Sequence, residues 1–209
     1  MSRATASLRS MPTGQRLLSC THSAEIWLDT EMQDLICVRK GALRVDCVCA
    51  GGERHFVTLV LEDELIGPWL RPEAGACYVL TALTRTVLEC RTVPEQAAEL
   101  YLNSLSAMAR RAARLSALVR GNAADRVMGL LTLLTGDRRE ATPIELPTRK
   151  NLADMTALTI ETVSRTITRL RKDGVLRPRR SKSARVNGAF MLHRPDLPEA
   201  PRDRLGMAA

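Results

Sequence analysis

The sequence predicts an α+β protein in which a β-rich N-terminal half is followed by one long helix and a helical C-terminal half. Three observations carry this prediction. Short apolar runs separated by glycine turns fill the N-terminal half, a heptad pattern follows Pro94, and two amphipathic segments begin after Thr148 and Thr159. With 209 residues, of which 45% are hydrophobic, the chain is long enough for two globular domains.

The N-terminal half has the pattern of an antiparallel sandwich or barrel. Its apolar runs are short, and turn residues such as Lys40-Gly41 and Gly67-Pro68 separate them. The predicted strands cover residues 35–38, 43–49, 55–61, 78–83 and 86–90.

The long helix between the halves carries an apolar seam about three heptads long. Its residues recur at alternating steps of four and three, which favours a two-stranded coiled coil and therefore a homodimer. The alternative is that the seam packs against the chain's own β domain. The seam consists of Tyr101, Leu105, Met108, Ala112, Leu115 and Val119. A further helix is predicted over residues 122–134.

Residues 148–175 have the pattern of a helix-turn-helix. Thr148 and Thr159 each precede an amphipathic segment, where a hydroxyl can cap the free N–H groups of a helix start. The turn is predicted at 156–158. The apolar residues expected to pack the two helices together are Leu152 and Met155 in the first, and Ile160, Val163, Ile167 and Leu170 in the second.

The second helix of this pair presents Glu161, Ser164 and Arg165 opposite its apolar stripe. Such a helix fits the major groove of double-stranded DNA, where Arg pairs with guanine and a carboxylate accepts from the cytosine amine. The alternative is an amphipathic surface helix with an ordinary charged exterior. The residue types therefore favour sequence-specific binding to DNA.

Positive charge is concentrated around this motif. Residues 145–185 contain eleven Lys and Arg against four Asp and Glu, an excess of seven, whereas the whole chain has 31 against 23. Such a cluster suits a phosphate-binding surface. Residues 175–179 and 184–186 are predicted as a small hairpin beside the helix pair. A basic tail for RNA or a membrane would explain the charge but not the two capped helices.

The segment LADMTALTIETVSRTITRLRKDGVL resembles the DNA-binding helices of the Crp/Fnr family of bacterial transcription regulators. Its E-x-x-S-R element is similar to the Fnr-like branch, and the segment DLICVRKGALRVDCVCAGGERHFVTLVLEDELIG resembles the family's β-roll sensor domain, with Gly41 and Gly67 at turn positions. The resemblance extends from about residue 12 to residue 186. One departure is Ala157, which occupies the turn position where the family usually has Gly.

The resemblance implies three parts: a cyclic-nucleotide-binding-like β-roll sensor domain over residues 1–93, a dimerisation helix over 94–120 and a winged helix-turn-helix over 121–209. It also implies a palindrome of TTGAT-like half-sites and activation through RNA polymerase, with repression by occlusion as the alternative. The expected DNA contacts are Arg149, Thr159, Glu161, Thr162, Ser164, Arg165, Arg169, Lys172 and Lys182.

The signal that this sensor domain would recognise is not the family's cyclic nucleotide. Cyclic-nucleotide binders in the family use a Gly-Glu pair for the ribose and an Arg for the phosphate. Here Pro68 follows Gly67, and Ala76-Cys77 stands where the Arg is expected. Without that cation the phosphate would lose charge-assisted contacts worth about 1.5–3 kcal/mol each.

Six cysteines are the other candidate sensors, at positions 20, 37, 47, 49, 77 and 90. Oxygen-sensing Fnr relatives hold an iron–sulfur cluster with a group of N-terminal cysteines, of which this chain has only Cys20. Cys47 and Cys49 share a strand face with Val45, which predicts core packing. No cofactor is predicted; an iron–sulfur or redox site drawing on Cys20, Cys37 or Cys77 is the alternative. His22 and His55 are isolated in the sequence and are expected not to bind metal or haem.

Enzymatic activity is not expected, because the sequence lacks Cys-x-x-Cys, G-x-S-x-G and H-E-x-x-H motifs. The nearest alternative is a thiol redox enzyme using the Cys-x-Cys at 47 and 49. No apolar run is long enough to cross a bilayer, and the N-terminus has no signal-peptide pattern. We therefore expect a cytoplasmic protein that has no membrane partner and whose thiols are reduced.

Overall fold

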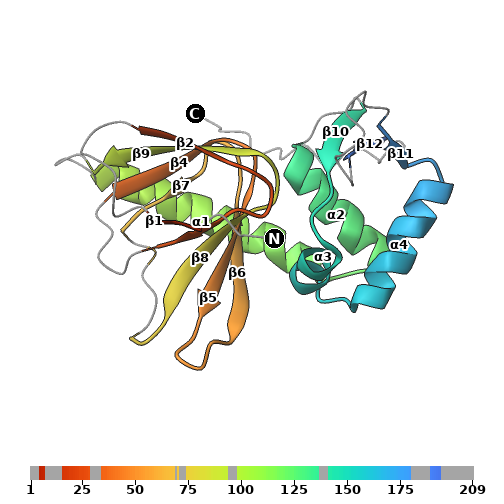
Figure 1. Cartoon of the computed structure of the whole chain (residues 1–209), viewed down its shortest axis with the longest axis horizontal. Helices are drawn as coiled ribbons and strands as arrows, with labels where there is room; N and C mark the ends of the chain where they lie inside the picture. The colour runs from red at the N-terminus through yellow and green to blue at the C-terminus, as the bar shows by residue number, and fades with distance from the viewer. Residues whose placement is uncertain are drawn as a thin grey trace, which may run out of the picture.

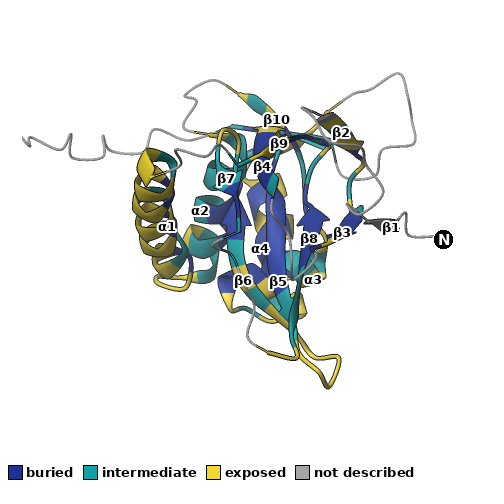
Figure 2. Cartoon of the chain, turned by 90° about the vertical axis from the view of Figure 1, so that its left-hand side faces the viewer, coloured by how far each residue is buried: buried dark blue, intermediate teal, exposed yellow. Residues whose placement is uncertain are grey.

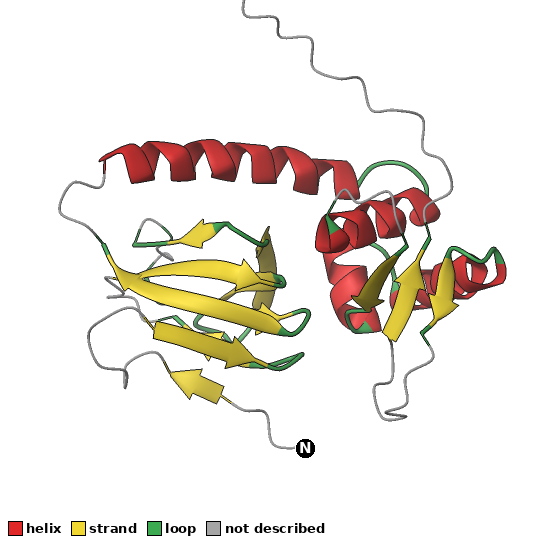
Figure 3. Ribbon diagram, turned by 90° about the horizontal axis from the view of Figure 1, so that it is seen from above, coloured by secondary structure: helices red, strands yellow, loops and turns green. Residues whose placement is uncertain are grey.

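The computed structural model describes residues 5–7, 16–28, 34–68, 70, 74–93, 98–136, 141–179 and 189–193. The N-terminal strands form one body, and three helices with a small sheet form a second (Figure 1). The long helix α1 (Ala98–Leu118) runs across the β body and ends at the helical body (Figure 3). The chain therefore has the predicted α+β architecture.

Two sheets make up the β body, and every described neighbouring pair of strands is antiparallel except β1 and β3. The first sheet has the order β1 (Thr5–Ser7), β3 (Glu25–Trp27), β8 (Cys77–Ala82), β5 (Leu43–Val48) and β6 (Arg54–Val60). The second has the order β2 (Arg16–Cys20), β9 (Thr86–Thr92), β4 (Asp34–Lys40) and β7 (Leu65–Ile66).

Apolar side chains from both sheets form one core. Leu43 and Leu80 of the first sheet are fully buried in the same cluster as Val38 and Leu88 of the second. All five predicted strands are confirmed to within two residues at each end. The sequence reasoning missed β1, β2, β3 and β7, which are only two to five residues long and show too little alternation to be recognised.

The turn at Gly41 connects β4 to β5 and requires glycine. Its φ is +91°, and a Cβ atom there would lie 2.7 Å from the carbonyl oxygen of Arg85. Both the left-handed backbone and the close approach exclude a larger residue. The predicted turn at this position is confirmed.

The prediction that Cys47 and Cys49 pack in the core is wrong. Val45 is fully buried, but Cys47 is partly exposed and Cys49 is exposed just beyond the end of β5. Figure 1 shows the reason: the ends of β5, β6 and β8 project together beyond the strands of the second sheet. Strand alternation predicts which residues lie on the same face of a sheet, but it does not predict how far the opposite sheet covers that face.

Helix α1 buries one line of residues against the rest of the chain. Ser104, Arg111 and Leu118 are buried at intervals of seven, and Arg111 Nε lies 2.9 Å from Glu64 Oε2 in an ion pair that is not aligned as a hydrogen bond. The predicted seam lies beside this line: each buried residue is preceded by a seam residue three positions earlier and followed by one at the next position, about 60° and 100° around the helix. Most of α1 is exposed in Figure 2.

The seam residues divide between two environments. Tyr101, Leu105 and Val119 are exposed, and Val119 lies one residue beyond the end of α1. Met108 and Ala112 are also exposed and Leu115 is partly exposed, but these three line a cavity of about 360 Å³ beside β6 and β7. The seam thus has an outward part and a part that faces the chain's own β body.

The helical body contains α2 (Ala123–Thr135), α3 (Arg149–Thr156) and α4 (Ile160–Lys172). The predicted helix at 122–134 is confirmed as α2, whose N-terminus is closed by a capping box between Asn122 and Asp125. Leu130, Leu152 and Ile167 are fully buried in the core that joins the three helices.

A three-stranded antiparallel sheet completes this body, in the order β10 (Thr142–Glu145), β12 (Ala189–Leu192) and β11 (Leu176–Pro178). The first strand of the predicted hairpin is confirmed as β11. The second, at 184–186, lies outside the described residues, and the strand that pairs with β11 is β12. Within the described part of the chain, no helix is long and apolar enough to cross a membrane.

Candidate nucleic-acid interface

Threonine hydroxyls start both helices of the helix-turn-helix, as predicted. Thr148 Oγ1 accepts the N–H of Asn151 at 3.1 Å, and Thr159 Oγ1 accepts the N–H of Thr162 at 3.2 Å. Each bond satisfies one of the N–H groups that a helix start leaves free. The two caps fix where α3 and α4 begin.

Ala157 makes the turn between these helices in a left-handed conformation, with φ 51° and ψ 45°. Its N–H and that of Leu158 both reach back to the carbonyl oxygen of Ala153, the second at 3.0 Å. The turn therefore has the backbone that suits Gly but carries Ala, at a cost of about 1 kcal/mol.

The inner face of α4 holds the helix against α2 and α3. Val163 and Ile167 are fully buried and Leu170 is nearly so. Ile160, expected on the same face, is 46% exposed, so that prediction is wrong. It is the first residue of α4, where the helix has not yet reached the core.

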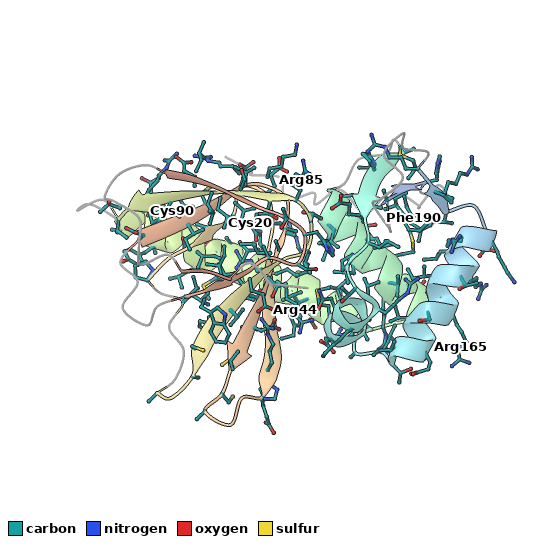
Figure 4. All side chains as sticks on the ribbon, in the orientation of Figure 1. Cys20, Arg44, Arg85, Cys90, Arg165 and Phe190 are labelled. Atoms are coloured by element: carbon teal, nitrogen blue, oxygen red, sulfur yellow. The ribbon has the colours of Figure 1, made fainter. Side chains whose placement is uncertain are left out.

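The opposite face of α4 carries the three residues predicted to read bases. Glu161 and Arg165 are exposed and Ser164 is partly exposed. Figure 4 shows Arg165 pointing away from the body of the protein. A shallow hollow on this face is lined by Ser164, Arg165, Thr168, Arg169 and Lys172.

Thr168 was not predicted as part of this face. It follows Ser164 by one helical turn, and its hydroxyl donates to the Ser164 carbonyl oxygen at 2.9 Å. The spacing of four residues was the signal that could have identified it. Arg171 was also missed; its guanidinium lies over the ring of Phe190 on β12.

The other residues predicted to contact DNA differ in their exposure and in the contacts they already make within the protein. Thr159 and Thr162 hydroxyls lie 3.0 Å apart and belong to the cap. Arg169 Nε lies 3.6 Å from Asp173 Oδ2, while Lys172 is exposed.

Arg149, at the start of α3, is partly buried. Burial lowers the pKa of Arg149 from its ordinary value, and the neighbouring Arg171 cation lowers it further. Arg remains charged at neutral pH in such a setting. Lys182 lies outside the described residues.

Similarity to known proteins agrees with this geometry. Residues 125–187 match the model of the Crp-like helix-turn-helix domain. The nitrogen fixation regulation protein FixK of Rhizobium meliloti (strain 1021) is 32% identical over 145 residues, which are 66% of this chain and 67% of that protein. The chain belongs to the Crp/Fnr family. The resemblance seen in the sequence is thereby confirmed.

Two further Crp/Fnr comparisons extend over more of the chain. The nitrogen fixation regulation protein FixK of Azorhizobium caulinodans is 29% identical over 195 residues, covering 83% of this chain and 76% of that protein. The structure of FixK2 from Bradyrhizobium japonicum has a TM-score of 0.59 at 24% sequence identity, covering 87% of this chain and 93% of that one. The fold is therefore that of the family along most of its length.

As a Crp/Fnr protein, the chain is a DNA-binding transcription regulator. The matched relatives are named as regulation proteins, which agrees with the expectation that the chain is not an enzyme.

The cysteines of this Crp/Fnr regulator are distributed over several strands. Among the described residues, no three His, Cys, Asp or Glu side chains are grouped so as to hold a metal ion. Cys20, Cys37 and Cys90 are buried and Cys77 is partly exposed. Burial raises the pKa of the Cys20 and Cys37 thiols, and Cys90 raises that of Cys20 further. These two thiols are held in the neutral, less reactive form.

The histidines differ in their surroundings. His22 Nδ1 and the Ser23 hydroxyl are hydrogen-bonded at 2.9 Å, whereas His55 is exposed with Nε2 3.5 Å from Glu53 Oε2. Neither belongs to a metal-binding group within the described residues.

Proposed function

We propose that this Crp/Fnr regulator binds DNA as a homodimer, with α4 of each subunit reading one TTGAT-like half-site of a palindrome. The observation that carries the proposal is the outward face of α4. Glu161, Ser164 and Arg165 lie in its first two turns, the part of a recognition helix that meets base edges. Arg165 suits guanine and Glu161 suits the cytosine amine.

Basic residues around α4 support contacts to the phosphates. Arg169, Lys172, Arg177 and Arg179 are exposed at or beyond the C-terminal end of the helix. Cations in these positions can neutralise phosphates on either side of the groove, which supplies affinity that does not depend on sequence. The base-reading and phosphate-binding roles are thus assigned to different parts of the surface.

Dimerisation is supported by the outward part of the α1 seam. Tyr101, Leu105 and Val119 are exposed apolar residues at heptad positions, and the buried line of α1 already provides contact with the β body. A second copy of α1 would cover these side chains as a two-stranded coiled coil. Two-fold symmetry then matches the symmetry of a palindromic site.

Control by a cyclic nucleotide is not part of the proposal. The cavity of about 360 Å³ between α1 and the β body is lined mainly by apolar side chains. Among its described lining residues the one cation is Arg111, and Glu64 lies 2.9 Å from it. A cyclic phosphate placed there would compete with that carboxylate.

We propose that the bound dimer activates transcription through contact with RNA polymerase.

Substitution of Arg165 tests the assignment of the base-reading face. Purified protein, reduced and kept anaerobic, is titrated with a fluorescent TTGAT-N4-ATCAA duplex and with duplexes altered at the guanine. Arg165→Ala should lose about 1–3 kcal/mol of preference for that guanine. Arg85→Ala, which removes an exposed charge from the β body, is the matched control. Unchanged guanine preference in Arg165→Ala would overturn the assignment.

A further inference from the structure

Arg44 is a buried cation at the junction between the two bodies of the chain. It lies on β5, is only 3% exposed, and stands where the β strands approach α3 (Figure 4). Its guanidinium bonds to both bodies. Nε donates to Asp46 Oδ1 at 2.7 Å, while Nη1 donates across the junction to Asn151 Oδ1 at 3.1 Å and to Asp154 Oδ2 at 3.0 Å.

A network within the β body holds Arg44 in place. Asp46 is 1% exposed, and its second oxygen lies 3.1 Å from Arg54 Nε. Arg54 in turn donates to Glu25 Oε1 at 2.9 Å. The Phe56 ring lies beside Arg44, with the guanidinium carbon 5.4 Å from its centroid. Contacts within the β body therefore orient the Arg44 side chain toward the helical body.

The two acceptors on α3 are held by bonds within that helix, and α3 itself packs against the recognition helix. Asn151 donates its N–H to the Thr148 cap, and Asp154 also accepts from Lys150 at 3.0 Å. Leu152 and Met155 on the same helix are buried in one core with Val163 of α4. A force on Asn151 or Asp154 is therefore transmitted to α4 through packed side chains.

Apolar contact also crosses this junction. Ala42, Leu59 and Leu83 of the β body belong to the same buried cluster as the core of the helices. Apolar burial holds surfaces together but imposes little direction, whereas a forked guanidinium between carboxylates has strict geometry. A buried ion pair contributes little net stability, so an orienting role accounts better for its presence.

We propose that Arg44 is a positioning residue for DNA reading: it sets the angle of α3 and α4 relative to the β body and thereby the separation of the two recognition helices in the dimer. The inference rests on the proposed dimeric function. It identifies the angle between the bodies, and not the base-reading face, as what Arg44 controls. Loss of Arg44 should therefore relax the preferred distance between half-sites without changing how one half-site is read.

The test is a spacer profile measured at equilibrium. TTGAT and ATCAA half-sites are separated by three, four, five or six base pairs, and one further duplex carries a single half-site. Wild-type protein should favour one spacer. Arg44→Met removes every bond that Arg44 makes across the junction, whereas Asp154→Ala removes its charged acceptor on α3 and leaves only the neutral Asn151 amide. Each variant should reduce that preference about fivefold or more. Their affinity for the single half-site should match the wild type.

Arg91→Met is the matched control, because Arg91 pairs with Glu89 within the second sheet and belongs neither to the Arg44 network nor to the junction. It should keep the wild-type profile. Asp154 is partly exposed, so its variant provides the decisive result even if Arg44→Met fails to fold. A wild-type profile in Asp154→Ala overturns the inference. Failure of wild-type protein to distinguish any palindrome from scrambled DNA would overturn the proposed function instead.

Discussion

The guanidinium carbon of Arg171, in the last turn of α4, lies 5.8 Å from the centroid of the Phe190 ring on β12. This contact joins the recognition helix to the small sheet that follows it. Phe190 also packs against the buried core of the helices. One aromatic side chain therefore braces the C-terminal end of α4 and orients a cation near the proposed phosphate-binding surface.

Phe190→Ala should destabilise the helical body by about 2 kcal/mol, less than a fully buried phenylalanine would, because the ring is only partly covered. Arg171→Gln removes the ring contact alone and should cost about 0.5–1 kcal/mol. Urea unfolding followed by circular dichroism measures both. Equal losses in the two variants would contradict the proposed division between core packing and cation–ring contact.

Ala157→Gly should stabilise the protein by about 1 kcal/mol. The left-handed backbone at position 157 strains a Cβ atom, and glycine removes that strain. The free energy gained by relieving this strain exceeds the cost of the extra conformational entropy that glycine gives the unfolded chain. Ala113→Gly on the exposed face of α1 is the control, where glycine should destabilise instead. A lower midpoint of urea unfolding for Ala157→Gly would show that the turn carries no strain.

Cys49 should react with a thiol reagent long before Cys20 and Cys37. It is exposed, whereas burial raises the pKa of the other two thiols. Because the folded state holds their protons more tightly, these thiols also make the free energy of unfolding fall as pH rises above about 8.5. Mass spectrometry after timed iodoacetamide labelling gives the order of reaction. Simultaneous labelling of all three sites is the contrary result.

Leu105→Arg should convert the proposed dimer into monomers. Leu105 is 59% exposed at the centre of the outward seam, and a cation there cannot be buried against a second copy. Ser106 is exposed and lies about 100° around α1 from Leu105, off the apolar seam, so Ser106→Arg should leave the dimer intact. Sedimentation velocity distinguishes the two species. A dimer that persists in Leu105→Arg would show that the seam is not the contact.

Local chemistry explains which parts of the fold could be predicted from sequence. The caps at Thr148 and Thr159 and the buried positions Val163 and Ile167 are encoded within one or two helical turns, so the helix pair was predicted closely. The left-handed turn at Ala157 was anticipated from the position where relatives carry Gly. The same local rules identified the outward face of α4.

The errors arise where structure depends on distant parts of the chain. Cys47 was assigned to the core because no sequence pattern shows where the second sheet ends. Arg44 was not identified because its partners Asn151 and Asp154 lie more than 100 residues away in the sequence. A buried arginine in a strand gives no periodic signal that distinguishes it from an exposed one.

The most direct test of the central claim is equilibrium binding of wild-type protein to TTGAT-N4-ATCAA, compared with a scrambled duplex of identical composition at physiological salt. The account predicts two chains per palindrome and an affinity at least about a thousandfold above that for the scrambled duplex. Equal affinity for the two duplexes, or saturation at one chain per palindrome, would contradict it.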